Sequence, residues 1–218
     1  MSICLIFLKK TKLALLPVLF FTLCLITQTP RTPLRTEYLP PPIALKNMTV
    51  GMKYQIADAL WLRALQDFDF CEKKIKDNEC AGKGWLFQLL NLITEIDPVL
   101  DPTMYAAAGL ALTVIVSDYQ GASLIFDKAV AQHRTNWQVQ YAAAYHALYE
   151  EKNKLKAARL YEAAGKFGAP NWVFALAGRL ASDSGADLYS KKILEGMINS
   201  KLDSKIIDRL RKRIEESK

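Results

Sequence analysis

The side chains that could carry out acid-base or nucleophilic chemistry are few in this chain and stand apart from one another. The 218 residues include only two histidines, His133 and His146. Asp97 and Asp101 lie close together, but a proline follows each, which is typical of carboxylates at helix ends rather than of a general acid-base pair. The sequence has no glycine-rich phosphate loop and no Gly-x-Ser-x-Gly elbow. It therefore predicts a protein that is not an enzyme and that holds no cofactor and no metal ion.

Tyrosines recur instead at a spacing that suits binding. Tyr141, Tyr145 and Tyr149 stand four residues apart, so on a helix they share one face. Tyrosine offers a large contact area at a low cost in conformational entropy. With Tyr105, which begins a similar segment, and His146, these tyrosines are the candidate residues for binding a partner. The alternatives are that the rings fill the space between packed helices and that His146 is a packed or solvated histidine.

Cys71 and Cys80 are the only cysteines beyond the N-terminal region, and the sequence between them, EKKIKDNE, is polar. A pair placed in this way predicts a disulfide that closes a short loop in an oxidising compartment. Two free thiols in a reducing compartment are the alternative. A zinc site would need four ligands, and no cluster of histidine or cysteine accompanies the pair.

The N-terminal region, residues 1–28, resembles an export signal or membrane anchor in its order of charges and apolar residues. Lysines at positions 9, 10 and 12 precede the apolar run at 13–27, LALLPVLFFTLCLIT. We expect a single-pass anchor in the bacterial inner membrane, with export after cleavage as the alternative. More basic residues stand before the run than after it, which favours a cytoplasmic N-terminus and places the remaining chain in the periplasm.

Residues 29–47 contain five of the nine prolines, which predicts an extended, polyproline-like linker. The formal net charge of +7 is concentrated near both ends of the chain. It predicts nucleic-acid binding only weakly, and we expect neither a nucleic-acid partner nor a small-molecule substrate. The basic residues after position 200 are interpreted as the solvated face of a terminal helix.

Residues 48–218 are predicted to form one all-α domain, because apolar residues recur there at helical spacing between capping residues, glycines and prolines. The expected helices cover residues 50–70, 85–97, 103–116, 120–133, 137–150, 153–167, 172–182, 185–198 and 203–216. The first eight form antiparallel hairpins, and the last is an amphipathic cap.

Three sequence echoes with a period of about 35 residues indicate that these hairpins repeat. Residues 105–108 and 141–144 are both Tyr-Ala-Ala-Ala, and Asn-Trp occurs at 136–137 and 171–172. The pattern Ala122, Phe126, Ala129 returns as Ala157, Tyr161, Ala164. The recurrence of Trp137 and Trp172 favours packing between repeats over a role in stacking on a ligand.

This small-large-small pattern resembles the second helix of tetratricopeptide (TPR) repeats. The likeness covers about residues 103–198, although Ser190 stands where a large residue is expected and the closing proline is absent or displaced. The resemblance implies an α-solenoid whose first helices line a concave surface that binds protein partners. We therefore expect a membrane-tethered periplasmic scaffold for envelope assembly, secretion or pilus biogenesis.

Two other functions remain open at this stage. One is a cell-wall enzyme on a helical scaffold, which would need a cleft that contains two of the carboxylates Asp58, Glu95 and Glu150. The other is a structural subunit of an envelope complex, which would expose a large apolar patch.

Overall fold

The structure is a computed structural model that describes residue 22 and residues 41–74, 84–200 and 202–216; it does not describe the side chains of 67–74 and of residue 216. The chain divides into two compact units, Met1–Tyr38 and Leu39–Lys218. The predicted membrane segment, most of the linker and the predicted Cys71–Cys80 disulfide lie outside the described residues and side chains. Within the described part, no helix has the length and apolar character needed to cross a membrane.

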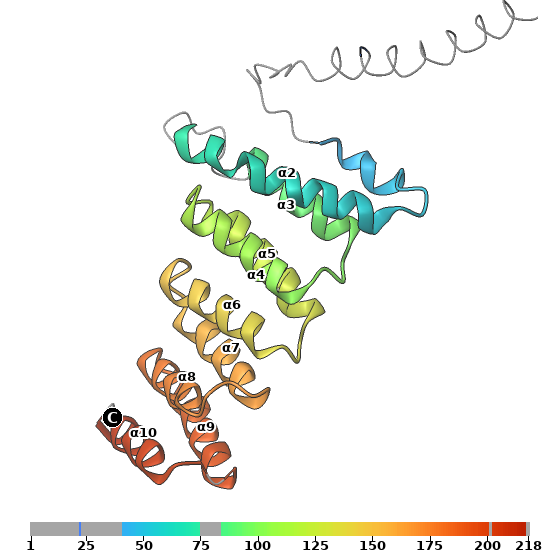
Figure 1. The fold of residues 1–218 in the computed structure, drawn as a ribbon. Coiled ribbons are helices and arrows are strands. Elements are labelled where there is room, and N and C mark those ends of the chain that lie inside the picture. Colours follow the sequence, from blue (N-terminus) through green and yellow to red (C-terminus); the bar gives the residue numbers. More distant parts are fainter. Residues whose placement is uncertain (1–21, 23–40, 75–83, 201, 217–218) are drawn as a thin grey trace, which may run out of the picture. The chain divides into compact units, whose positions relative to one another are not determined.

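The described residues of the second unit form helices and no strands, which confirms the predicted all-α class. Among the described residues, a short 3-10 helix, η1 (Ile43–Asn47), precedes nine α-helices. They are α2 (Lys53–Lys74), α3 (Trp85–Ile96), α4 (Pro102–Val114), α5 (Tyr119–Gln132), α6 (Trp137–Tyr149), α7 (Lys154–Lys166), α8 (Trp172–Asp183), α9 (Asp187–Asn199) and α10 (Ser204–Glu216). Figure 1 shows their succession along the unit.

Polar side chains fix where several of these helices begin. Asp101, Asp118, Asn136 and Asn153 each accept a hydrogen bond from a backbone N–H in the first turn of the helix that follows. Such caps satisfy amide groups that the helix itself leaves without partners. The predicted position of Asp101 at a helix end is therefore confirmed.

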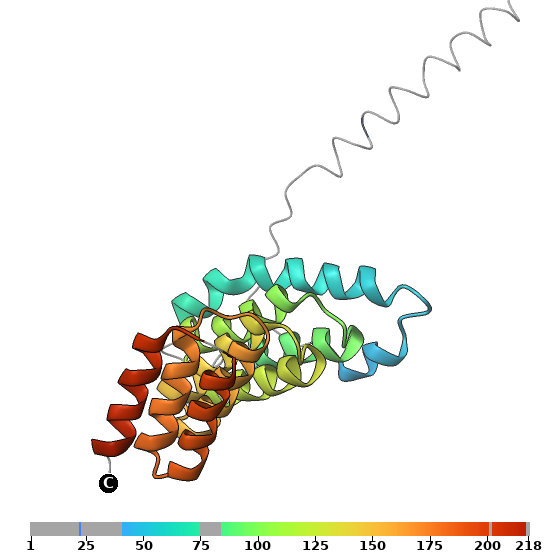
Figure 2. The same ribbon diagram turned by 90° about the horizontal axis from the view of Figure 1, so that it is seen from below.

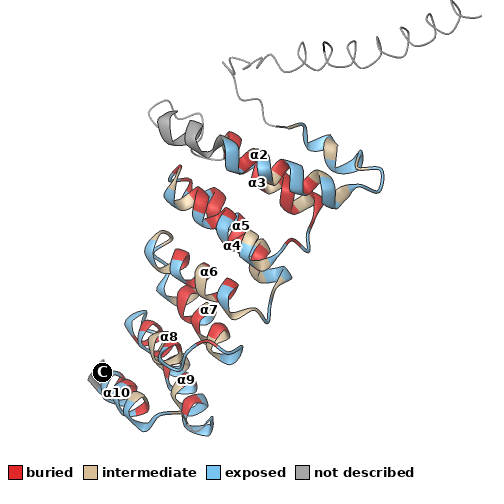
Figure 3. Cartoon of the chain, in the orientation of Figure 1, coloured by how far each residue is buried: buried red, intermediate tan, exposed pale blue. Residues whose placement is uncertain are grey.

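The helices pack in adjacent pairs, α2 with α3, α4 with α5, α6 with α7 and α8 with α9, and each pair contacts the next. Figure 2 shows the helices of these pairs lying side by side. Buried residues gather on the sides of the helices that face their neighbours (Figure 3). This arrangement is that of a helical-repeat fold, in which each hairpin buries its apolar face against the hairpin beside it.

The small-large-small pattern explains how the helices approach one another. Ala122 and Ala129 are fully buried on either side of the buried Phe126 in α5. The Phe126 ring lies so close to Gly109 of α4 that a Cβ atom at position 109 would stand 2.5 Å from it. Small residues thus let α4 and α5 come together, and the aromatic ring fills the space that remains.

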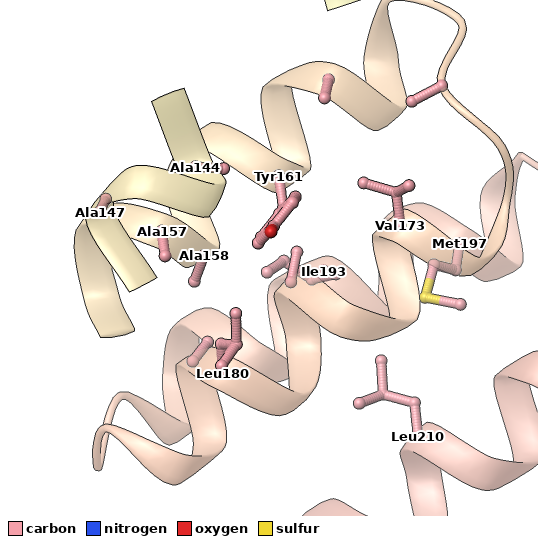
Figure 4. Close-up of a cluster of buried hydrophobic side chains, with 14 of the residues drawn as sticks. Ala144, Ala147, Ala157, Ala158, Tyr161, Val173, Leu180, Ile193, Met197 and Leu210 are labelled. Carbon is pink, nitrogen blue, oxygen red and sulfur yellow. The ribbon is translucent and has the colours of Figure 1, made fainter. Parts of the chain in front are cut away.

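Tyr161 plays the same part in the next hairpin. It lies between Ala157 and Ala164 in sequence, and its side chain is 1% exposed. Figure 4 shows its ring among Ala158, Ile193 and other apolar side chains from several helices. Tyr161 therefore joins three consecutive helices, α7, α8 and α9, into one apolar core.

The last hairpin departs from the pattern at Ser190, and the structure shows how it compensates. Ser190 is fully buried, and its hydroxyl donates a hydrogen bond to the Gly178 carbonyl oxygen at 2.8 Å. Leu210 of α10 packs against Gly178, where an added Cβ atom would stand 2.5 Å from it. The final helix thus supplies the bulk that the second helix of this hairpin lacks, as a capping helix does.

Two boundaries differ from the sequence-based expectations. The end of the predicted linker is not extended, since residues 43–47 form η1, which packs against α3 with an ion pair of 2.9 Å between Lys46 Nζ and Glu95 Oε2. Helix α2 also continues past Cys71 to Lys74 instead of ending at residue 70. The first difference arises because local composition carries no information on the contact that η1 makes with α3.

Candidate partner-binding groove

The predicted tyrosine stripe lies on α6 and lines a groove. Tyr145 and Tyr149 are 46% and 49% exposed, and their ring centroids are 4.5 Å apart. Tyr141, one turn earlier, is partly buried. The i, i+4 spacing predicted this shared face, and the packing of α6 leaves its later part open to solvent.

Aromatic residues from α7 and α8 complete the wall beside Tyr141. The Tyr161 ring lies edge-on to Tyr141 with a centroid distance of 5.3 Å, and the Trp172 ring does so at 6.0 Å. Trp172 is 49% exposed. Trp172 therefore contacts the preceding hairpin, as its recurrence suggested, and also lines the groove.

The groove has a volume of about 510 Å³ and extends onto the C-terminal helix. Its base includes Leu176 of α8 and Leu210 of α10. Three arginines also line it: Arg179 of α8 and Arg209 and Arg213 of α10. The groove is therefore formed by α6 and α8, which are the first helices of their hairpins, and by the final helix α10. Tyr161 is the one described lining residue from a second helix, α7.

The electrostatic character of the groove is positive. None of its described lining residues is acidic. Arg213 Nη2 lies 3.5 Å from Asp183 Oδ1 at the rim, with the arginine side chain 53% exposed. Burial raises the pKa of the Tyr161 hydroxyl above its usual value, so that this phenol stays neutral. The groove thus combines uncharged aromatic faces with cationic groups.

Two of the predicted binding residues lie elsewhere and are buried. Tyr105 is 1% exposed, and its hydroxyl donates a hydrogen bond to the Pro98 carbonyl oxygen at 3.3 Å. Burial raises its pKa to about 12. Its ring lies edge-on to His133, whose Nε2 donates to the Leu100 carbonyl oxygen at 2.8 Å. His133 stands at the end of α5, as predicted. The Tyr105 ring fills space between packed helices, which was the alternative to partner binding.

His146 lies in α6 with 2% of its surface exposed, and it does not line the groove. Its Nδ1 is 3.1 Å from Thr113 Oγ1 and its Nε2 is 3.0 Å from Ser123 Oγ, while its ring packs against Phe126. The side chain therefore links α4, α5 and α6. For this residue too, the structure shows the packed alternative.

The surroundings of His146 make its protonation unfavourable in the folded state. Burial lowers its pKa below 6.5, although Glu151, 4.0 Å from Nε2, partly offsets the effect. Both hydroxyls also lie within donating distance of backbone carbonyls. A neutral imidazole carries one N–H, so one of the two hydroxyls must donate to the ring instead.

We expect the free energy of unfolding to decrease as the pH falls from about 7 to about 5. The pKa of His146 is lower in the folded state than in the unfolded state. The neutral ring therefore contributes fully to the free energy of unfolding above pH 6.5, and this contribution is lost as the pH falls through the folded-state pKa. Urea titrations at several pH values measure this dependence. The variant His146→Gln should flatten the decrease between these pH values. An unchanged slope in the variant would contradict this role of His146. Below about pH 4.5, protonation of Glu151, whose pKa is lowered, adds a further loss.

Glu95 is one of the three carboxylates considered for an enzyme, with Asp58 and Glu150. Glu95 lines a separate pocket of about 420 Å³ that includes neither Asp58 nor Glu150. A hydrogen bond from Lys46 holds the pKa of Glu95 below its usual value, which keeps it ionised and unsuited to general acid catalysis. No group of three or more potential metal ligands occurs in the part of the chain that the structure describes.

Sequence reasoning missed the three arginines of the groove. The spacing of Arg209 and Arg213, four residues apart, showed that they share a face of the last helix. It could not show that this face lies beside α8. From sequence, the basic residues of that helix are therefore expected to form a solvated surface.

These observations define the described part of the chain from residue 41 onward as a stack of helical hairpins with an aromatic, cationic groove near its C-terminal end. Comparisons with family models, with curated proteins and with solved structures found no match to the chain.

Proposed function

We propose that this protein is a TPR-like scaffold that holds a segment of a partner protein in the groove formed by α6, α8 and α10. The observation that carries the proposal is the set of half-exposed aromatic rings, Tyr145, Tyr149 and Trp172, gathered along one groove. Solvent-exposed aromatic residues that line a concave surface are typical of sites where protein chains bind.

The size and composition of the groove favour a protein segment as the ligand. A volume of about 510 Å³ accommodates a few side chains of an extended or helical peptide. Aromatic rings that are already held by neighbours lose little entropy on binding, and Tyr141 fixes the positions of Trp172 and Tyr161 through edge-on contacts.

The proposed location is the bacterial inner membrane, with the helical domain in the periplasm. The basis is the charged and then apolar N-terminal region and the Cys71–Cys80 pair in the sequence. A scaffold tethered in this way would serve envelope assembly, secretion or pilus biogenesis.

One observation favours a second candidate, a structural subunit that assembles through its N-terminal hairpin. Exposed apolar side chains occur on η1, on the turn after it and on α2: Ile43, Met48, Val50, Met52, Tyr54, Leu62 and Leu65. Large apolar patches on a protein surface are typical of assembly sites, so exposed apolar residues that occur this close together in the sequence support this candidate.

Photo-crosslinking in intact cells tests the proposal. We expect a photoreactive phenylalanine analogue at Tyr145 to yield a discrete adduct with a partner protein. The same analogue at Tyr119, a tyrosine of similar exposure on α5 outside the groove, should yield none. The Tyr149→Ala substitution should reduce the adduct at position 145 several-fold, because an exposed aromatic anchor contributes about 2 kcal/mol or more to such contacts.

Two outcomes would contradict the groove proposal. One is the absence of any adduct at position 145, and the other is an equal yield at positions 145 and 119. An adduct obtained only with the analogue at Leu62 would support the structural subunit instead.

A further inference from the structure

The three arginines of the groove are placed so that their charges converge. Arg209 and Arg213 stand one turn apart on α10, and Arg179 faces the same groove from α8. All three side chains are exposed, so water solvates their positive charges in the free protein. Like charges gathered on one surface nevertheless raise the local potential and attract anions.

Among the described residues, only one arginine of this cluster lies near a carboxylate. Arg213 has the contact of 3.5 Å with Asp183, whereas neither Arg179 nor Arg209 forms an ion pair with a carboxylate of the described residues. Arg211, on the other side of α10, shows the contrast, because it pairs with Asp208 of its own helix at 3.1 Å. The groove is thus the place where α8 and α10 leave guanidinium groups available.

We propose that the groove takes an acidic segment of its partner protein. Aspartate or glutamate carboxylates of that segment would pair with Arg179, Arg209 and Arg213. Apolar or aromatic side chains between them would pack on Tyr145, Tyr149 and Trp172. A guanidinium offers a planar fork of donors that matches a carboxylate, so the cluster suits this chemistry better than lysines would. This inference rests on the proposed function and adds the chemistry of the ligand.

The same residues fit a nucleic acid less well. Non-specific binding to nucleic acid depends on a track of basic residues that contact on the order of 6–10 phosphates. The described lining of the groove has three arginines and no lysine. The cationic side chains come from α8 and α10 alone, and α6 contributes uncharged tyrosines. A short acidic peptide matches this limited cluster.

Selection from a random peptide library against the full-length purified protein tests the proposal. We expect the selected peptides to be enriched in aspartate and glutamate. Their affinity should fall about tenfold in the double variant Arg179→Gln/Arg209→Gln and should weaken as salt is raised. The matched control is Arg134→Gln/Arg211→Gln, which removes the same charge at exposed positions outside the groove and should bind normally.

The remaining outcomes separate this inference from the function on which it rests. Peptides that depend on Tyr145 and Tyr149 but lack acidic enrichment, or that bind the arginine variant normally, would overturn the acidic ligand and leave the groove proposal intact. Failure to select any peptide that distinguishes the protein from its Tyr145→Ala/Tyr149→Ala variant would overturn both. If an oligothymidylate bound more tightly than the selected peptides, and if this binding required the arginines, the cluster would be assigned to nucleic acid instead.

Discussion

The Tyr161→Ala substitution is expected to lower the free energy of unfolding by about 3–5 kcal/mol, the range found when a large buried aromatic side chain is truncated. Tyr161 is 1% exposed and contacts apolar residues of α8 and α9 as well as its own helix. Alanine would leave a cavity between helices that cannot collapse without moving a whole hairpin. Urea titration followed by the circular dichroism of the helices measures the loss.

Phe126→Ala is the matched comparison, because Phe126 occupies the same position in the preceding hairpin and is 2% exposed. We expect a similar loss of stability. The two variants should differ in binding, since Tyr161 lines the groove and supports Tyr141, whereas Phe126 does neither. A loss below about 1 kcal/mol in both variants would contradict the role assigned to these rings in joining the hairpins.

The Gly109→Ala substitution is expected to destabilise the protein by about 1–3 kcal/mol, the usual cost of overpacking a core. The added methyl group would lie 2.5–2.8 Å from three atoms of the Phe126 ring. That ring is buried and also contacts His146, so it has little room to turn away. The helices α4 and α5 would have to separate. The measurement is again the free energy of unfolding in urea.

Gly196→Ala provides a control of opposite sign. Gly196 lies within α9. Apart from its chain neighbours and the nearby backbone of its own helix, no atom stands within 4 Å of the position that an added Cβ would take. Alanine there should stabilise the protein by about 0.4–1 kcal/mol, because it restricts the unfolded chain and favours helix. If both variants were stabilised, the close contact between Gly109 and Phe126 would not be a structural requirement.

The helices themselves could be predicted from sequence because their signals are local. Asp101, Asn136 and the prolines mark helix ends, and the apolar period marks the faces. The nine predicted ranges agree with the observed bounds to within a few residues. The pairing of helices followed from the same period, because a hairpin with one apolar face must bury it against the next. The resemblance to TPR repeats stays a prediction.

The sequence predicted the tyrosines of the groove but not its arginines, and the reason is physical. The spacing of Tyr141, Tyr145 and Tyr149 showed that they share a face, but spacing cannot show which part of a face a neighbouring helix covers.

The sequence by itself determined the helices, their caps and their arrangement in repeating hairpins, since these depend on residues within about 35 positions of each other. The tertiary structure alone decided that Tyr105 and His146 are buried and that Trp172 is half exposed. It also decided that α10 brings Arg209 and Arg213 beside the tyrosines of α6. These outcomes depend on the angle and depth at which helices distant in sequence pack. Contacts such as that of the Leu210 side chain with the backbone of Gly178 set this angle and depth.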